Sequence, residues 1–157
     1  MINHLKTDYM YTKVTNNSFL YQQQTKQAYV AYLDTFSWDF FLTGSTRYDM
    51  TLKSVRRLVE RWYERIRLEG CTTLFWVAEP FELKDGHHFH GLLELPNCGK
   101  QYYKLMIDWW QWATGNGEGT KEKWNALNLQ TYDPKRNAGS YCSKYVMKDR
   151  SDYDILC

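Results

Sequence analysis

The strongest constraint on the fold is a predicted β-hairpin near the middle of the 157-residue chain. Two hydrophobic runs, Leu74–Ala78 and Phe89–Leu95, flank a polar segment that contains the turn-forming pair Asp85-Gly86. Hydrophobic runs separated by such a turn predict two antiparallel strands. We therefore expect the fold to contain an antiparallel sheet that includes this pair of strands.

The second arm of the hairpin carries His88 and His90. Side chains on a strand alternate between its faces, so both imidazoles are expected on one face and His87 on the other. Glu79 ends the first arm, where strand pairing would bring its carboxylate beside the imidazoles. A histidine on a strand is usually a surface residue or a hydrogen-bonded core residue. Two imidazoles together with a carboxylate, however, predict a divalent-cation site with open coordination positions.

Hydrophobic periodicity predicts the remaining elements, in the chain order strand, helix, strand, strand, helix, strand, helix. They are a strand over 38–44, a helix from Leu52 to about Leu68 with Thr51 as its N-cap and Gly70 at its end, the two hairpin arms, a helix over 100–113, a strand over 125–132 and a helix over 137–148. This order is typical of an α+β fold of the split βαβ, ferredoxin-like type, in which helices cover mainly one face of an antiparallel sheet.

Aromatic residues make up 17% of the chain, more than a core of this size is expected to bury. Exposed rings can stack on unpaired bases, although a tryptophan-rich core and half-buried tyrosines account for many of them. The net charge of +2 does not by itself indicate nucleic-acid binding, so any basic surface must be local. On the polar face of the helix over 52–68, Arg56 and Arg57 lie either on a solvated surface or beside a phosphate backbone.

The length is that of a single domain, which we expect over residues 36–157. Residues 1–35 are polar and are expected to form an N-terminal extension. Its apolar periodicity between residues 18 and 33 is weak. This segment is therefore either a helix or arm that packs on the domain, or an arm that contacts DNA.

Cysteine spacing and hydrophobic run length indicate the compartment. The four cysteines show neither Cys-x-x-Cys pairs nor zinc-finger spacing, and no secretory signal is recognised, which predicts free thiols in a reducing cytoplasm. No apolar run approaches the roughly 20 residues that span a bilayer. We therefore expect a soluble, intracellular protein without membrane contact.

The predicted helix over 137–148 carries a second set of candidate residues. Tyr141 and Tyr145 are four residues apart, which places them on one face of a helix, with Lys144 and Lys148 on a ridge beside them. A tyrosine pair at this spacing usually serves packing. A tyrosine hydroxyl becomes a capable nucleophile, however, beside a cation that polarises a phosphodiester and a lysine that stabilises negative charge. The combination predicts transesterification of DNA.

Three segments, in this chain order, resemble the motifs of HUH endonucleases, the superfamily of rolling-circle replication initiators. Phe41-Leu42-Thr43 resembles the first motif, a hydrophobic strand that ends in Leu-Thr and helps to position DNA. His88-Phe89-His90 matches the His-hydrophobe-His motif that binds Mg²⁺ or Mn²⁺. The segment from Tyr141 to Tyr145 matches the Y-x-x-K-Y form of the tyrosine motif.

The resemblance also suggests a third metal ligand. Glu79 stands where these initiators commonly carry an acidic ligand on the adjoining strand. Because this assignment rests on spacing, Glu82 and Asp85 remain alternatives.

The resemblance implies a Mn²⁺- or Mg²⁺-dependent enzyme that nicks and rejoins single-stranded DNA at a replication origin, either unpaired or in a hairpin, in the cytoplasm of a host cell. Tyr141 is then the first nucleophile and forms a 5′-phosphotyrosine, Tyr145 is the candidate second nucleophile, and Lys144 stabilises charge. The expected DNA contacts are Thr43, Ser45, Arg56, Arg57 and Lys148. The chain has no Walker lysine motif, so a host helicase and polymerase are the expected partners.

Two alternatives remain open. Single-strand transposases and plasmid relaxases use the same chemistry. A non-catalytic module that binds single-stranded nucleic acid has the same sheet topology and needs no metal.

Overall fold

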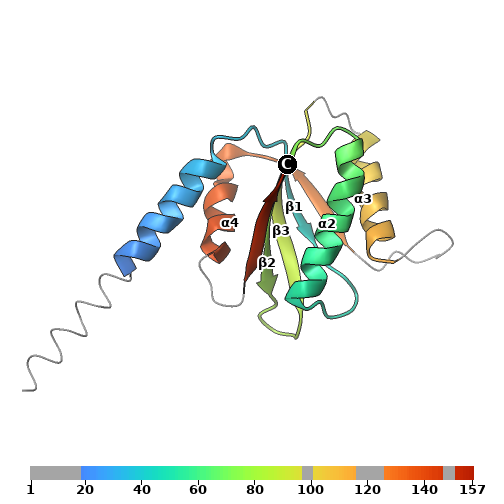
Figure 1. Ribbon diagram of the computed structural model, residues 1–157, viewed down its shortest axis with the longest axis horizontal. Coiled ribbons are helices and arrows are strands. Elements are labelled where there is room, and N and C mark those ends of the chain that lie inside the picture. The colour runs from blue at the N-terminus through green and yellow to red at the C-terminus, as the bar shows by residue number, and fades with distance from the viewer. Residues whose placement is uncertain (1–18, 97–100, 116–125, 147–150) are drawn as a thin grey trace, which may run out of the picture.

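The computed structural model describes residues 19–96, 101–115, 126–146 and 151–157. These residues form an α+β structure with one five-stranded antiparallel sheet in the order β4-β1-β3-β2-β5 (Figure 1). The strands are β1 (Phe40–Gly44), β2 (Thr73–Pro80), β3 (His87–Glu94), β4 (Leu127–Thr131) and β5 (Asp152–Leu156). The helices are residues 19–33, α2 (Leu52–Leu68), α3 (Gln101–Ala113), α4 (Ala138–Val146) and a 3-10 turn, η1 (Pro134–Arg136).

The predicted hairpin is confirmed and lies inside the sheet. β2 and β3 pair antiparallel, with Glu79 opposite His88 and Val77 opposite His90. The connecting turn is closed by a hydrogen bond from Phe81 N to Gly86 O of 3.1 Å. Gly86 has a φ of +90° there, a conformation that glycine adopts without steric cost.

The helix α2 also follows its sequence prediction. Thr51 is its N-cap, and its side-chain oxygen accepts a hydrogen bond from Ser54 N at 3.1 Å. The apolar stripe faces the sheet and is buried at Val55, Leu58, Val59, Trp62 and Ile66. Gly70, with a φ of +101°, follows the last turn.

Helices cover both faces of the sheet: α2 and α3 lie on one face, and α4 and the helix over 19–33, here called the N-terminal helix, lie on the other (Figure 1). On one face, Leu42, Trp76 and Phe89 pack with side chains of α2 and α3 in the larger core. On the other, Phe75, Val77 and Leu92 pack with Leu33 of the N-terminal helix and Cys142 of α4. Among the described residues, no helix is both long and apolar enough to cross a membrane.

The prediction that helices lie mainly on one face is therefore wrong. The strand β2, which lies between β3 and β5, is buried on both sides, since residues 73–79 are all buried. A strand with two buried faces carries a continuous hydrophobic run instead of an alternating one. The run Leu74–Ala78 has this pattern, and it requires a second helical layer.

The strand β5 was not predicted. Asp152–Leu156 is a half-buried edge strand that pairs with β2. Arg56 of α2 binds it through ion pairs to Asp152 and Asp154, both at 2.7 Å. These contacts join residues about a hundred positions apart in the chain, so local periodicity gives no sign of them.

Candidate metal centre

Three potential metal ligands meet on the face of the sheet that α4 covers. Glu79 comes from the end of β2, and His88 and His90 come from the start of β3, as predicted. Glu79 Oε2 lies 3.2 Å from His90 Nε2 and 3.5 Å from His88 Nε2. The two Nε2 atoms are 3.0 Å apart. Among the described residues, these three form the group that could hold a metal ion, and Glu82 and Asp85 are not part of it.

The spacing of these atoms fits a small divalent cation. Ligand atoms placed about 2.1 Å from an octahedral cation, at right angles, lie about 3 Å from each other. The three measured separations are 3.0, 3.2 and 3.5 Å. Two imidazoles and one carboxylate leave further coordination positions open for substrate and water.

The environment of the imidazoles favours their neutral, metal-binding form. Burial, reinforced by the neighbouring His88, lowers the pKa of His90 to about 4. Burial also lowers the pKa of His88, although the Glu79 carboxylate opposes this shift. A neutral imidazole has a lone pair available for a cation at neutral pH.

Two neighbours hold the histidine rings in place. Thr43, opposite His90 on β1, has its Oγ1 2.9 Å from His90 Nδ1. A hydrogen bond at Nδ1 leaves Nε2 directed at Glu79 and fixes the ring orientation. The Phe81 ring stacks on His88 at a centroid distance of 4.6 Å.

The candidate nucleophile Tyr141 lies beside this group. Its ring meets His90 edge-on at a centroid distance of 5.2 Å and Phe41 at 6.0 Å. The Tyr141 side chain remains 40% exposed, so it is accessible to a large substrate. Lys144 Nζ lies 5.9 Å from the centre of the Tyr141 ring.

The position of Tyr141 follows from how α4 begins and packs. Asn137, in the left-handed conformation, ends η1 and accepts the first helical hydrogen bond, from Tyr141 N at 3.0 Å. Cys142 and Val146 bury one side of α4 against the sheet. Tyr141 therefore projects from the flank of the helix that borders His90. The Tyr145 side chain and Lys148 lie outside the described residues.

A pocket of about 370 Å³, here called the Arg136 pocket, opens next to Tyr141. Its lining combines three rings, Phe41, His90 and Tyr141, with three polar side chains, Gln130, Asp133 and Arg136. Sequence reasoning missed the three polar residues. The only sign of Gln130 was its polar position in the alternating strand over 125–132, and nothing local marked Arg136.

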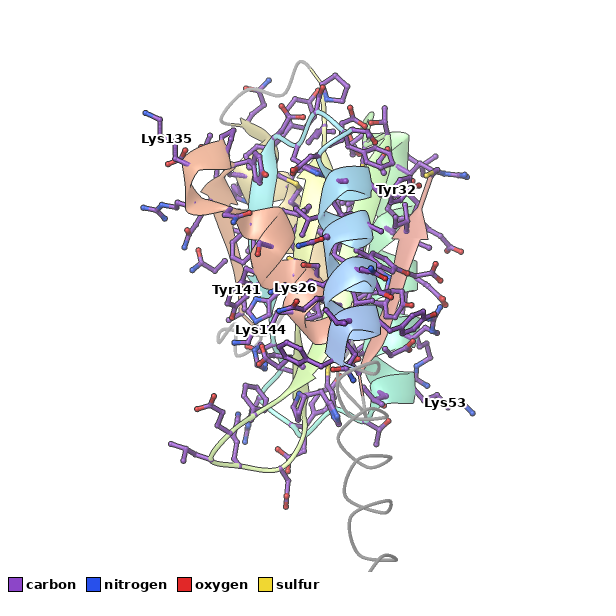
Figure 2. All side chains as sticks on the ribbon, turned by 90° about the vertical axis from the view of Figure 1, so that its left-hand side faces the viewer. Lys26, Tyr32, Lys53, Lys135, Tyr141 and Lys144 are labelled. Carbon is purple, nitrogen blue, oxygen red and sulfur yellow. The ribbon has the colours of Figure 1, made fainter. Side chains whose placement is uncertain are left out.

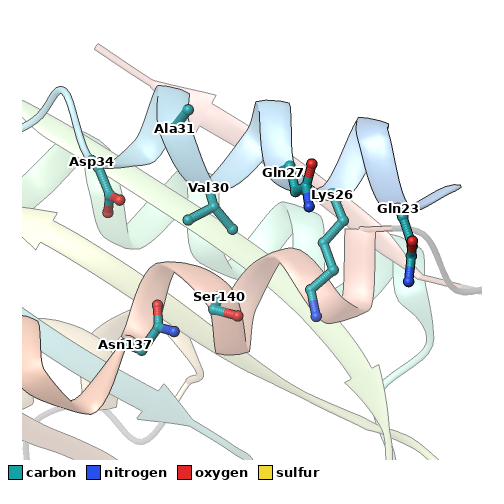
Figure 3. A pocket seen from close by; sticks show the side chains of 8 residues that line it. All are labelled: Gln23, Lys26, Gln27, Val30, Ala31, Asp34, Asn137 and Ser140. Atoms are coloured by element: carbon teal, nitrogen blue, oxygen red, sulfur yellow. The ribbon is translucent and has the colours of Figure 1, made fainter. Parts of the chain in front are cut away.

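A groove of about 510 Å³ lies between α4 and the N-terminal helix. Figure 3 shows Lys26 pointing from that helix toward α4, with Asn137 and Ser140 below it. In Figure 2, Lys26, Tyr141 and Lys144 appear on the same side of the molecule. The N-terminal helix therefore adds a cation close to the residues of α4, which the sequence did not indicate.

The other predicted DNA contacts are separated from the candidate metal ligands. Arg56 and Arg57 belong to α2, on the opposite face of the sheet. Arg56 is bound to Asp152 and Asp154 of β5, whereas Arg57 is exposed. Ser45 follows β1, and its carbonyl accepts a hydrogen bond from Trp110 at 3.3 Å. The structure brings Thr43, Tyr141 and Lys144 to the candidate metal centre, but not the two arginines.

Comparisons of the chain with protein-family models, with curated proteins and with solved structures found no match.

Proposed function

We propose that this protein is a metal-dependent endonuclease that nicks and rejoins single-stranded DNA through a tyrosine, in the manner of HUH replication initiators. The observation that carries the proposal is the contact between Tyr141 and a three-ligand group for a divalent cation. A phosphodiester and a tyrosine nucleophile need such a cation nearby, because the phenol is otherwise a weak nucleophile.

The sheet topology supports the same proposal. The chain passes from β1 through α2 to β2 with β3 between them, and from β3 through α3 to β4 with β1 between them. Two such interleaved crossovers characterise the ferredoxin-like fold expected from the resemblance to HUH endonucleases. The strand β5 and the second helical layer are additions to that pattern.

Glu79, His88 and His90 would hold Mn²⁺ or Mg²⁺ on the face of the sheet that α4 covers. The bound cation would withdraw charge from a phosphodiester oxygen and make the phosphorus more electrophilic. Thr43 would keep His90 in the tautomer that leaves Nε2 unprotonated, because its hydroxyl oxygen would accept a hydrogen bond from Nδ1–H. Burial of the ligands limits competition by protons.

Tyr141 would attack the phosphorus with its phenolic oxygen. The new bond joins this oxygen to phosphorus, and the bond from phosphorus to the 3′-oxygen of the preceding nucleotide breaks. The phenol loses one proton and the leaving 3′-oxygen gains one, so the products are a 5′-phosphotyrosine and a free 3′-hydroxyl. Because no water is consumed, the reverse attack by a 3′-hydroxyl rejoins DNA. Lys144 would stabilise the charge that develops during the transfer.

The biological role that follows is initiation of rolling-circle replication in the cytoplasm of a host cell. A host polymerase would extend the free 3′-hydroxyl and a host helicase would unwind the duplex. Tyr145, one turn after Tyr141 on α4, would serve as the second nucleophile when the origin is regenerated.

A covalent-adduct assay tests this function. The protein is mixed with labelled single-stranded DNA from the origin of its own replicon, with Mn²⁺ or with EDTA, and run on a denaturing gel. We expect a metal-dependent shifted band that is lost in Tyr141→Phe and kept in Tyr32→Phe, an exposed tyrosine of the N-terminal helix. A band that survives in Tyr141→Phe refutes Tyr141 as the first nucleophile. Binding without any adduct, and insensitive to EDTA, would identify a non-catalytic binding module.

A further inference from the structure

The Arg136 pocket has the chemistry of a site for a single nucleobase. Part of its lining is aromatic, since Phe41 lies half-buried on the sheet and Tyr141 stands edge-on to it at a centroid distance of 6.0 Å. The polar part, made by Gln130, Asp133 and Arg136, is exposed to solvent. Aromatic rings stack on unpaired bases, and polar groups beside them read the base edge. The volume of about 370 Å³ is large enough for one base.

Arg136 is the group that can distinguish one base from another. Its Nη1 donates to Gln130 Oε1 at 3.3 Å, and Gln130 is fixed by the pairing of β4 with β1, opposite Phe41. Within the described part of the chain, no carboxylate forms an ion pair with Arg136, in contrast to Arg56. Its remaining N–H groups are therefore available to a ligand, held in a fixed fork.

We propose that the Arg136 pocket binds one unpaired guanine of the DNA strand, next to the phosphate that Tyr141 attacks. That the bound nucleic acid is a DNA strand attacked by Tyr141 rests on the proposed function. Guanine presents two adjacent acceptors, O6 and N7, which a guanidinium contacts with two parallel hydrogen bonds. Adenine presents a donor beside N7, which opposes the guanidinium, and pyrimidines lack the O6 and N7 pair. An unpaired cytosine offers the acceptors O2 and N3 on its Watson–Crick edge, so equal or tighter binding of the cytosine oligonucleotide would overturn the assignment to guanine. Gln130 acts as a positioning residue that orients the fork.

The test uses binding alone, so that it does not depend on nuclease activity. Fluorescent dT12 is compared with the same oligonucleotide that carries one guanine, adenine or cytosine, in EDTA, by fluorescence anisotropy. One bidentate base contact corresponds to a preference of about tenfold or more, which we expect for guanine only. A single 7-deazaguanine, which lacks the N7 acceptor, should bind like thymine.

Three variants assign the preference to the pocket. Arg136→Lys keeps the charge but loses the fork, so it should bind dT12 normally with the same salt dependence and no longer prefer guanine. Gln130→Ala should reduce the guanine preference without changing the affinity for dT12. Lys135→Ala, an exposed neighbour that does not line the pocket, is the matched control and should leave the preference intact.

Several outcomes would overturn the inference. They are equal binding of all four bases, a guanine preference that survives in Arg136→Lys, and the absence of binding to every oligonucleotide. Failure of the guanine site can be distinguished from failure of the proposed function. A covalent adduct without guanine preference refutes the base site alone, whereas a guanine preference without any adduct refutes the endonuclease and leaves the base site standing.

Discussion

Thr43 Oγ1 lies 2.9 Å from His90 Nδ1, across the pairing of β1 with β3. The resemblance to HUH endonucleases assigned Thr43 to DNA positioning, but in the structure its hydroxyl contacts a candidate metal ligand. The last residue of the first motif thereby contacts the second motif at His90, and the same side chain also lines the Arg136 pocket.

This contact predicts that Thr43 controls metal affinity. Valine has a similar shape but cannot accept a hydrogen bond from His90 Nδ1–H, so we expect Thr43→Val to lower the Mn²⁺ affinity by about 10- to 100-fold. Thr43→Ser keeps the hydroxyl and should retain most of the affinity. Isothermal titration calorimetry with Mn²⁺ measures both. Equal affinity in Thr43→Val and the unaltered protein would show that the hydroxyl does not orient His90.

The second prediction separates Glu79 from the acidic residues of the turn. A ligand that binds only the folded state at about 100 times its Kd stabilises that state by about 2.7 kcal/mol. Excess Mn²⁺ should therefore raise the midpoint of thermal unfolding, and Glu79→Gln should lose most of that increase. Glu82→Gln, an exposed position in the turn, is the matched control and should keep it. The reverse result would make Glu82 the ligand.

The third prediction concerns the attachment of β5. Arg56 forms ion pairs with Asp152 and Asp154 and lies over the Trp76 ring at 5.1 Å. Because the Arg56 side chain is 34% exposed, solvent screens these pairs. Arg56→Met should therefore lower the free energy of unfolding by only about 1–2 kcal/mol, measured by urea titration. Arg57, the next residue, is exposed, so Arg57→Met should change the free energy of unfolding by less than about 0.5 kcal/mol. Equal effects would exclude a specific role for Arg56.

The fourth prediction gives the N-terminal helix a part in DNA binding. Lys26 lines the groove between the N-terminal helix and α4. Ser140, the residue before Tyr141, lines the same groove. If the strand crosses this groove, Lys26→Ala should weaken binding of every oligonucleotide alike and reduce the dependence of log K on log salt by about 0.7. Lys53→Ala, on α2 and far from this groove in Figure 2, should leave the slope unchanged. Equal slopes for both variants would place the strand elsewhere.

The elements that follow from local pattern were predictable, and those that depend on distant partners were not. The N-cap of α2 follows from the Thr51 side chain and a backbone N–H three residues later. The hairpin register, which pairs Glu79 with His88 and brings His90 near both, is set by alternation and by one turn. The edge strand β5 pairs with β2 and contacts Arg56, both distant from it in the chain, and the Arg136 pocket depends on η1 following β4. Neither partnership leaves a periodic signal in the sequence.

The sequence by itself placed His88 and His90 on one face of a strand and put Glu79, with Glu82 and Asp85 as alternatives, in the same hairpin, because side chains alternate with a period of two on a strand and the turn is short. The structure selected Glu79 as the carboxylate beside the two candidate ligands. Only the tertiary structure decided which surface works with them. The packing of α4 on β2 and β3 brings Tyr141 to His90, and the second helical layer brings Lys26 beside α4. Long-range packing also pairs Arg56, on α2 at the opposite face of the sheet, with Asp152 of β5. Side-chain identity defines the chemistry that a residue can perform, whereas long-range packing decides which residues perform it together.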